Sequence, residues 1–388
     1  MTGEYIRRRP HSGPSMIQRT VVFALAVVAL PQISAAQSSR NWEDLADEIA
    51  HQVERQVDQI SRHVERQADQ VARYMERRFE AQGGRGRGRG FGRGPEYTEA
   101  FSRTVRLGRT GTFDLQNVSG DITVTGAGGD DVRIEATKRV RHPNEAEAKT
   151  ILSEIEIQVQ ERSGRVDVRT EYPRGRNWAG GVDFTVSVPR DASVALRTVS
   201  GTVKVSNVNG ELRAESVSGD IIASSARKLR TAKTVSGDLE ITDAEADEFS
   251  ASTVSGDVIV NRLKASGFDA QSVSADLRLT DVDVDHASLR SVSGDIEYGG
   301  RLQKGGRYQF QSHSGDVRVT PMDARGFSVE ASTFSGDVRS DYTLTLQGGT
   351  GNSLVGPGRN RSVRGTFGDA GATLTLQSFS GDIVIVRR

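Results

Sequence analysis

Carboxylates recur at nearly constant spacing through much of this chain, each within the tripeptide Ser-Gly-Asp or a close variant. On strands stacked about 4.8 Å apart, such carboxylates could bind a row of cations or the hydroxyl groups of a sugar. Adjacent carboxylates would repel each other by about 0.9 kcal/mol even at the dielectric constant of water. Backbone amides, neighbouring Lys or Arg side chains, or a bound cation must offset this repulsion. The residues of this candidate ladder are Asp220, Asp238, Asp257, Asp276, Asp295, Asp316 and Asp337.

A structural role explains the same motif without a ligand. Glycine permits a bend with positive φ, and Ser and Asp side chains can bond to nearby backbone amides. Ala275 replaces the glycine in one copy and Thr202 replaces the aspartate in another. We therefore predict a structural turn and keep a cation ladder or a specific ligand site as alternatives. The predicted turn glycines are Gly120, Gly201, Gly219, Gly237, Gly256, Gly294, Gly315, Gly336 and Gly381.

Signals for other chemistry are weak. The chain has no cysteine, which excludes disulfides, thiolate metal sites and cysteine catalysis. It has no phosphate-binding loop, zinc-binding helix motif or nucleophile elbow with a credible His and Asp. The candidate carboxylates all belong to the regular repeat. We therefore expect no catalytic activity, cofactor or dedicated metal site, and keep a carbohydrate-active β-helix enzyme, of the polysaccharide lyase or hydrolase type, as the alternative.

The spacing of the motif predicts the fold. Its third residue lies at 201, 219, 237, 256, 275, 294, 315 and 336, in steps of 18 to 21 residues. A fixed period near 20 is typical of stacked repeats. Apolar and polar residues alternate directly after the motif, as in Leu239-Glu240-Ile241, which predicts half-buried strands. We predict an all-β protein, with a β-solenoid resembling a parallel β-helix over residues 97–388 and one inserted helix at 145–153, capped by Asn144.

The N-terminal residues predict export. Residues 1–36 combine basic residues, the apolar run 21–30 and Ser34-Ala35-Ala36 before Gln37, which together are typical of a signal peptide. Met16 is an alternative start. A ten-residue run is too short to span a membrane, and we expect no transmembrane span after cleavage. The predicted location is periplasmic, outer-envelope-associated or extracellular. Lys plus Arg and Asp plus Glu both number 51, so we expect no nucleic-acid partner.

Residues 41–82 predict a long amphipathic helix with an 11-residue repeat. Eleven residues over three turns keep the apolar stripe almost straight. We expect self-association through this helix, as a bundle or coiled coil, with docking on the β domain or lying on a membrane surface as alternatives. Residues 83–96 form a Gly/Arg-rich flexible linker. The stripe consists of Leu45, Ile49, Val53, Val57, Ile60, Val64, Ala68, Val71, Met75 and Phe79.

The Val-Ser-Gly-Asp repeats, the lead-in at 184–189 and the closing Leu-Gln-Ser-Phe-Ser-Gly-Asp-Ile ending at Ile383 resemble the bacterial putative-adhesin family. That family is a domain of unknown function in exported and envelope-associated proteins, and the resemblance covers about residues 98–388. It implies a β-solenoid without known catalysis, and some relatives are tied to envelope-stress responses. It supplies no binding residues. We expect a non-enzymatic envelope protein that serves adhesion, ligand display or envelope-stress-related interactions, with an envelope polymer or a protein as its ligand.

Overall fold

The computed structural model describes residues 94–173, 178–323, 325–346 and 362–388, which are nearly all β-structure. The predicted signal peptide (1–36), the predicted helix (41–82) and most of the predicted linker lie outside these residues and stay predictions. The first strand begins at Glu96, the last residue of the predicted linker.

The strands fall into three groups along the chain. The N-terminal strands are β1 (Glu96–Arg106), β2 (Thr112–Gln116), β3 (Ile122–Ala127), β4 (Asp131–Arg141), β5 (Glu156–Arg162), β6 (Arg165–Glu171) and β7 (Ala179–Pro189). The central strands are β8 (Ser193–Arg197), β9 (Val203–Ser206), β10 (Glu211–Glu215), β11 (Ile221–Ser224), β12 (Lys228–Lys233), β13 (Leu239–Ser252), β14 (Val258–Ser274), β15 (Leu277–Ser293) and β16 (Ile296–Ser314). The C-terminal strands are β17 (Val317–Met322), β18 (Gly326–Ser335), β19 (Val338–Ser340), β20 (Thr345–Leu346), β21 (Ser362–Gly368), β22 (Ala372–Ser380) and β23 (Ile383–Ile385).

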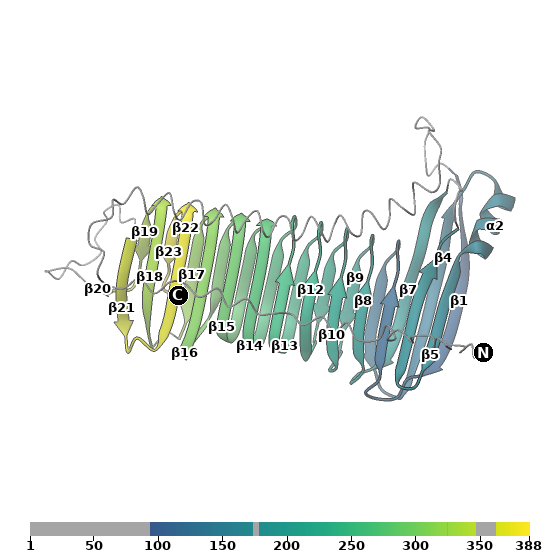
Figure 1. Cartoon of the computed structure of the whole chain (residues 1–388), viewed down its shortest axis with the longest axis horizontal. Coiled ribbons are helices and arrows are strands. Elements are labelled where there is room, and N and C mark those ends of the chain that lie inside the picture. Colours follow the sequence, from purple (N-terminus) through teal and green to yellow (C-terminus); the bar gives the residue numbers. More distant parts are fainter. Residues whose placement is uncertain (1–93, 174–177, 324, 347–361) are drawn as a thin grey trace, which may run out of the picture. The chain divides into compact units, whose positions relative to one another are not determined.

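Successive repeats pair in parallel, in register, as a solenoid requires (Figure 1). The residue that follows each motif Asp stacks on its counterpart in the next repeat, and each of these side chains is buried. A second buried row comes from the strand segments that precede the motifs, where Ala214, Ala232, Ala251 and Ala270 are partners. Both rows belong to one hydrophobic core, so the period-two pattern correctly predicted a thin solenoid core. The first row consists of Ile122, Val203, Ile221, Leu239, Val258, Leu277, Ile296, Val317, Ile383 and Val338.

Antiparallel strands close the N-terminal end. Strand β4 pairs with β7, β1 pairs with β4, and β5 pairs with β6. The edge strand β1 is mostly exposed and carries charged residues such as Glu99 and Arg103, which discourage pairing with another chain. Helix α2 (Glu145–Glu154) follows β4, as predicted. Its first turn is capped by Asn144, whose Oδ1 accepts hydrogen bonds from the backbone N–H groups of Ala146 (2.9 Å) and Glu147 (3.3 Å).

At the C-terminal end the spatial order of the repeats departs from their order in the chain. Strand β22 pairs in parallel with both β16 and β18, so the corner with Gly381 lies between those with Gly315 and Gly336. Strand β23 likewise lies between β17 and β19. The last strands of the chain thereby gain a partner on each side, which leaves no unpaired backbone on them. Motif spacing alone does not predict this insertion, because the two neighbouring motifs look like consecutive repeats.

A second corner, five residues after the motif Asp, uses left-handed backbone. Asn207, Ser225, Asp243, Arg262 and Asp281 all have φ between 53° and 59°. Asn and Asp tolerate this region better than other residues with side chains. Ser225 and Arg262 are the exceptions, and the guanidinium of Arg262 bonds to both carboxylate oxygens of Asp243, with Nη2 at 2.9 Å from Oδ2. This conformation was not foreseen, although the Asn and Asp residues at a fixed offset from the motif were a signal for it.

Candidate functional site

The Ser-Gly-Asp corners lie above one another in a single row. Isolated parallel bridges join Ser119, Ser200, Ser218, Ser236, Ser255 and Ser274 in succession. Strand pairing extends the row through Ser293, Ser314, Ser380 and Ser335. Ten corners therefore present equivalent groups at the spacing of neighbouring strands, as the sequence predicted.

Each ladder carboxylate except that of Asp337, the last in the stack, accepts a hydrogen bond from the next corner. Oδ1 of Asp220 lies 3.0 Å from the backbone nitrogen of Asp238, and Oδ1 of Asp238 lies 2.8 Å from that of Asp257. The same contact continues at distances of 2.7–3.2 Å to the C-terminal end. In stack order the ladder is Asp220, Asp238, Asp257, Asp276, Asp295, Asp316, Asp382 and Asp337. The structure thus brings together every predicted ladder residue and places Asp382 within the row.

These hydrogen bonds offset the electrostatic repulsion between stacked carboxylates. A backbone N–H group donates to every ladder Asp that has a further corner above it. Arg278 adds positive charge, because its guanidinium nitrogens lie 3.0 Å from Oδ2 of Asp257 and 2.6 Å from Oδ2 of Asp276. Within the part of the chain that the structure describes, no group of three or more His, Asp or Glu could hold a metal ion. The geometry supports the structural-turn interpretation.

The corner glycines permit close approach of neighbouring corners, and all except Gly219 also have a positive φ. A Cβ at Gly256, where φ is +128°, would lie 2.1 Å from the carbonyl oxygen of Gly237. At every other predicted turn glycine a Cβ would come within 2.1–2.4 Å of a carbonyl oxygen of the neighbouring corner or strand. Gly219 has no left-handed φ, and neither has Ala275, so the methyl group of Ala275 carries no left-handed backbone strain. The predicted turn glycines are Gly120, Gly201, Gly219, Gly237, Gly256, Gly294, Gly315, Gly336 and Gly381.

The sequence analysis missed a row of buried hydroxyl groups inside the corners. The residue two positions before each motif Ser is Ser or Thr in nine copies and Asn117 in the first, and all are buried. Several donate to the glycine carbonyl of the preceding corner, as Thr234 does to Gly219 (3.2 Å) and Thr333 to Gly381 (2.8 Å). The signal was visible, because a small polar residue precedes every Val-Ser or its variant at the same distance. The row consists of Thr198, Ser216, Thr234, Thr253, Ser272, Ser291, Ser312, Ser378 and Thr333.

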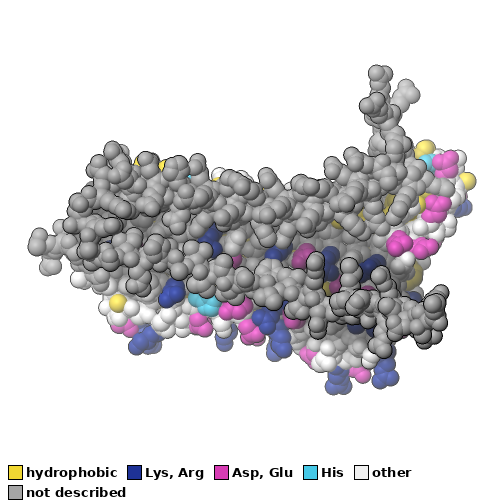
Figure 2. All heavy atoms as spheres, viewed as in Figure 1, with side chains coloured by type: hydrophobic (Ala, Val, Ile, Leu, Met, Phe, Trp, Pro, Cys, Tyr) yellow, Lys and Arg dark blue, Asp and Glu magenta, His cyan; other side chains and the backbone are white. Residues whose placement is uncertain are grey.

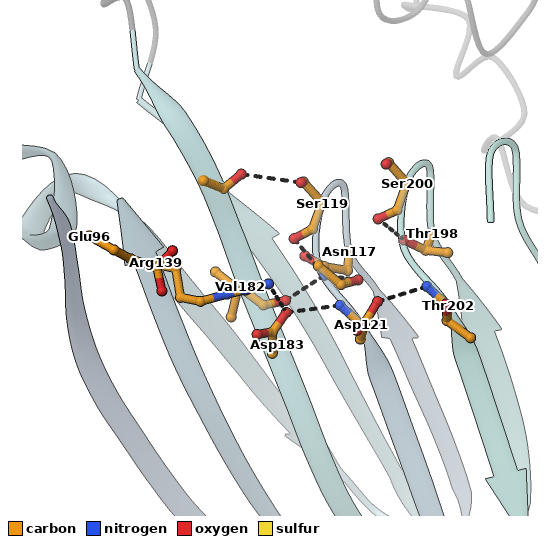
Figure 3. A network of polar contacts seen from close by, with 12 residues as sticks. Glu96, Asn117, Ser119, Asp121, Arg139, Val182, Asp183, Thr198, Ser200 and Thr202 are labelled. Carbon is orange, nitrogen blue, oxygen red and sulfur yellow. Dashed lines mark hydrogen bonds and ion pairs between the residues drawn. The ribbon is translucent and has the colours of Figure 1, made fainter. Parts of the chain in front are cut away.

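A polar network of the same kind precedes the ladder and depends on a residue outside the repeats (Figure 3). Asp183 of β7 accepts from the backbone N–H of Asp121 (3.0 Å) and from the guanidinium of Arg139 (2.6 Å). Asp121 in turn accepts from the backbone N–H of Thr202 (2.9 Å). Nearby, the hydroxyl of Tyr172 lies 2.9 Å from the backbone oxygen of Ser119, and burial raises the pKa of Tyr172. Asp183 thus supplies the carboxylate of a first corner that lacks the motif.

A second cluster of acids and arginines lies at the N-terminal end. Asp114 and Asp167 are partners in the β2–β6 register and are both buried. Arg165 lies 2.8 Å from Asp167 and 3.5 Å from Asp114, and Arg197 lies 3.3 Å from Asp114. The hydrogen bond with Asp167 raises the pKa of Arg165. The expectation that candidate carboxylates occur only in the repeat was therefore wrong, because pairing of β2 with β6 joins residues that are far apart in sequence.

The ladder geometry gives a testable result at Asp295. Its Oδ1 lies 2.8 Å from the backbone nitrogen of Asp316, so Asp295→Ala should remove the acceptor and lower the free energy of unfolding by about 1 kcal/mol. Asp295→Asn keeps an oxygen in place and should cost less than half as much. Chemical unfolding followed by circular dichroism, with EDTA or with Ca²⁺, measures both. A cation ladder would instead make Asn as damaging as Ala and would add stability with Ca²⁺.

Residues 227–386 match the family described as Toastrack DUF4097. No curated protein matches the chain. Three solved structures are similar at low identity: a putative cell adhesion protein from Clostridium sporogenes (9% identity, 75% of this chain and 100% of that one, TM-score 0.20), a putative adhesin from Bacteroides fragilis (13%, 75% and 97%, 0.36) and a putative adhesin from Parabacteroides distasonis (12%, 76% and 98%, 0.38).

These three identities and TM-scores are too low to carry an argument about function. The family match, in contrast, spans the corners from Gly237 to Gly381 and therefore most of the carboxylate ladder. The match of residues 227–386 to the Toastrack DUF4097 family confirms the putative-adhesin resemblance of the sequence.

Proposed function

We propose that this protein is a non-enzymatic scaffold of the cell envelope that serves adhesion, ligand display or envelope-stress-related interactions. One observation carries the proposal: the repeated carboxylates are engaged by the backbone of the next corner, so the motif builds the stack. A regular stack of this kind presents a long surface without requiring a pocket. The family match supports the proposal because it covers most of the ladder.

The outward positions of the central strands indicate the chemistry of a partner. The exposed side chains directly after the buried motif row alternate in charge, from Lys204 through Glu240, Arg278 and Glu297 to Arg318. On the face shown in Figure 2, Lys and Arg side chains lie among Asp and Glu. A surface of mixed charge suits a polar polymer or a protein better than it suits a partner of uniform charge.

Binding to envelope polymers can be measured by co-sedimentation of the mature protein with purified peptidoglycan sacculi and, separately, with outer-membrane fragments. We expect retention with one of these fractions, weakened when Lys204 and Arg318 are both replaced by Glu. Glu240→Gln and Glu297→Gln form the matched control, which should leave retention unchanged or stronger. Absence of retention with both fractions would contradict adhesion to these polymers.

Export is a separate expectation. The signal-peptide pattern predicts that the mature protein begins at Gln37. Among the described residues, no helix is long and apolar enough to span a membrane. N-terminal sequencing of the protein from its native cells, together with cell fractionation, tests the prediction. A cytoplasmic protein that still begins at Met1 or Met16 would rule out the envelope assignment.

A carbohydrate-active enzyme is the second candidate, and one observation favours it. Asp114 and Asp167 are adjacent buried carboxylates, and pairs of carboxylates perform glycoside hydrolysis. Both are ion-paired with Arg165 or Arg197, which favours a structural role. We expect no release of reducing ends from a panel of polysaccharides. Release that disappears in Asp114→Asn or Asp167→Asn would establish the enzyme instead.

A further inference from the structure

One row of side chains in the corners is at least partly exposed, although every member except His313 is apolar. It consists of the residue between the buried Ser or Thr and the outer Ser of each motif, and none of its members is fully buried. Strand-like stacking in ten successive corners makes the row about 43 Å long, at about 4.8 Å for each of nine steps. We call this row the corner ridge. In stack order it is Val118, Val199, Val217, Val235, Val254, Val273, Val292, His313, Phe379 and Phe334.

The ridge ends in a stack of aromatic rings. The rings of His313 and Phe379 stack with centroids 4.8 Å apart, and those of Phe379 and Phe334 stack at the same distance. Phe334 is 42% exposed, and no other large hydrophobic side chain among the described residues is classed as exposed. Single exposed apolar residues are ordinary on protein surfaces, whereas a continuous row indicates a surface that binds a partner.

The chain itself contains a segment of matching length and chemistry. The apolar stripe from Ile49 to Phe79 covers 30 residue steps, or about 45 Å as an α-helix. Its 11-residue period keeps the stripe nearly straight, as a row of stacked corners requires. On a straight helix a heptad stripe turns by about 20° every seven residues, which is faster than the turning of an 11-residue stripe. We propose that the stripe of segment 41–82 docks lengthwise on the corner ridge of the same chain.

The linker between segment 41–82 and the solenoid sets the direction in which the segment docks. Glu96 at the start of β1 pairs with Arg141, which pairs with Ala179. Ala179 lies two residues before Gly181, whose Cβ would come 2.5 Å from the backbone oxygen of Ser119. The solenoid therefore begins near the Val118 end of the ridge. Residues 83–95 can span at most about 45 Å when extended. Strand β1 lies three strand spacings, about 14 Å, beyond β3, so the Phe334 end of the ridge is about 58 Å from the start of β1 and out of the reach of the linker. Docking would therefore place Phe79 towards Val118 and Ile49 towards Phe334.

Paired cysteines test both the docking and its direction, because the chain has no cysteine of its own. The matched pairs are Met75→Cys with Val199→Cys and Ile49→Cys with Phe379→Cys. The swapped pairs, Met75→Cys with Phe379→Cys and Ile49→Cys with Val199→Cys, are the controls, since the two ridge positions lie about 34 Å apart. A short bis-maleimide is added to the dilute mature protein, and the products are separated on a denaturing gel.

We expect the matched pairs to give an intramolecular cross-link and the swapped pairs to give none. Cross-links between chains would overturn the proposal in favour of self-association through segment 41–82. Equal yields from matched and swapped pairs, or no cross-link at all, would overturn it as well. Flotation with anionic liposomes that requires residues 41–82 would show that a membrane surface occupies the stripe instead.

Proteolysis supplies a second measurement that does not depend on the cysteines. The segment carries arginines such as Arg55 and Arg66, which trypsin can cleave once the helix is released. Val235→Lys with Val254→Lys should speed this cleavage while the circular dichroism of the solenoid is unchanged. Thr280→Lys, at an exposed strand position away from the ridge, is the matched control. Equal cleavage rates in the two variants and the unmodified protein would contradict docking.

Discussion

Val258→Asp is expected to lower the free energy of unfolding by about 4 kcal/mol, or to prevent folding. Val258 is fully buried and is stacked between Leu239 and Leu277, which are fully buried too. The new carboxylate would therefore be surrounded by apolar side chains without a partner. Urea unfolding of the mature protein, followed by far-ultraviolet circular dichroism, measures the loss.

Asp257→Asn, one residue earlier, is the matched control. Asp257 accepts from the backbone N–H of Asp276 through Oδ1 (3.2 Å) and from Arg278 through Oδ2 (3.0 Å). Asparagine keeps an acceptor for the amide and loses only a partly exposed ion pair, so the cost should be below about 1 kcal/mol. Similar losses in the two variants would show that the direction of the two side chains is wrong.

Period-two alternation predicts that Val254, Val258 and Val260 all point inward, and this is correct for two of the three. Val258 and Val260 are fully buried, as the period-two pattern requires, but Val254 is partly exposed and belongs to the corner ridge. Counting back from Val258 in steps of two places Val254 inward. The bend at Gly256 shifts this phase, so that Thr253 points inward instead. Alternation is therefore a reliable guide along a strand and fails across a corner.

The candidate site likewise contains some contacts that the repeat period predicts and others that depend on how the strands are arranged. The positions of the ladder aspartates follow from their period, and backbone amides were among the partners that could offset their repulsion. Asp183 could not be identified, because it contacts the corner of Asp121 through the parallel pairing of β7 with β3. The place of Asp382 between Asp316 and Asp337 likewise depends on insertion of the last strands of the chain. Motif spacing predicts neither contact.

Gly256→Ala is the second change expected to have a large effect. At φ +128° a side chain is already strained, and the new Cβ would lie 2.1 Å from the carbonyl oxygen of Gly237. That oxygen belongs to the backbone of the neighbouring corner, which cannot move aside without disturbing the ladder contact between Asp238 and Asp257 (2.8 Å). We expect a loss of about 3 kcal/mol or more in the free energy of unfolding, measured as above.

Gly305→Ala is the control for Gly256→Ala, because it tests the effect of a positive φ without a steric clash. Gly305 also has a left-handed φ, +80°, but a Cβ there would have no atom within 4 Å. The substitution should cost about 1 kcal/mol, from backbone strain alone. A loss at Gly256 no greater than that at Gly305 would show that the corners can separate by the roughly 1 Å that a methyl group needs there. In a stack where each repeat contacts only its neighbours, such slack at one corner would also be expected at the others, and the glycine would then be required for φ rather than for close approach.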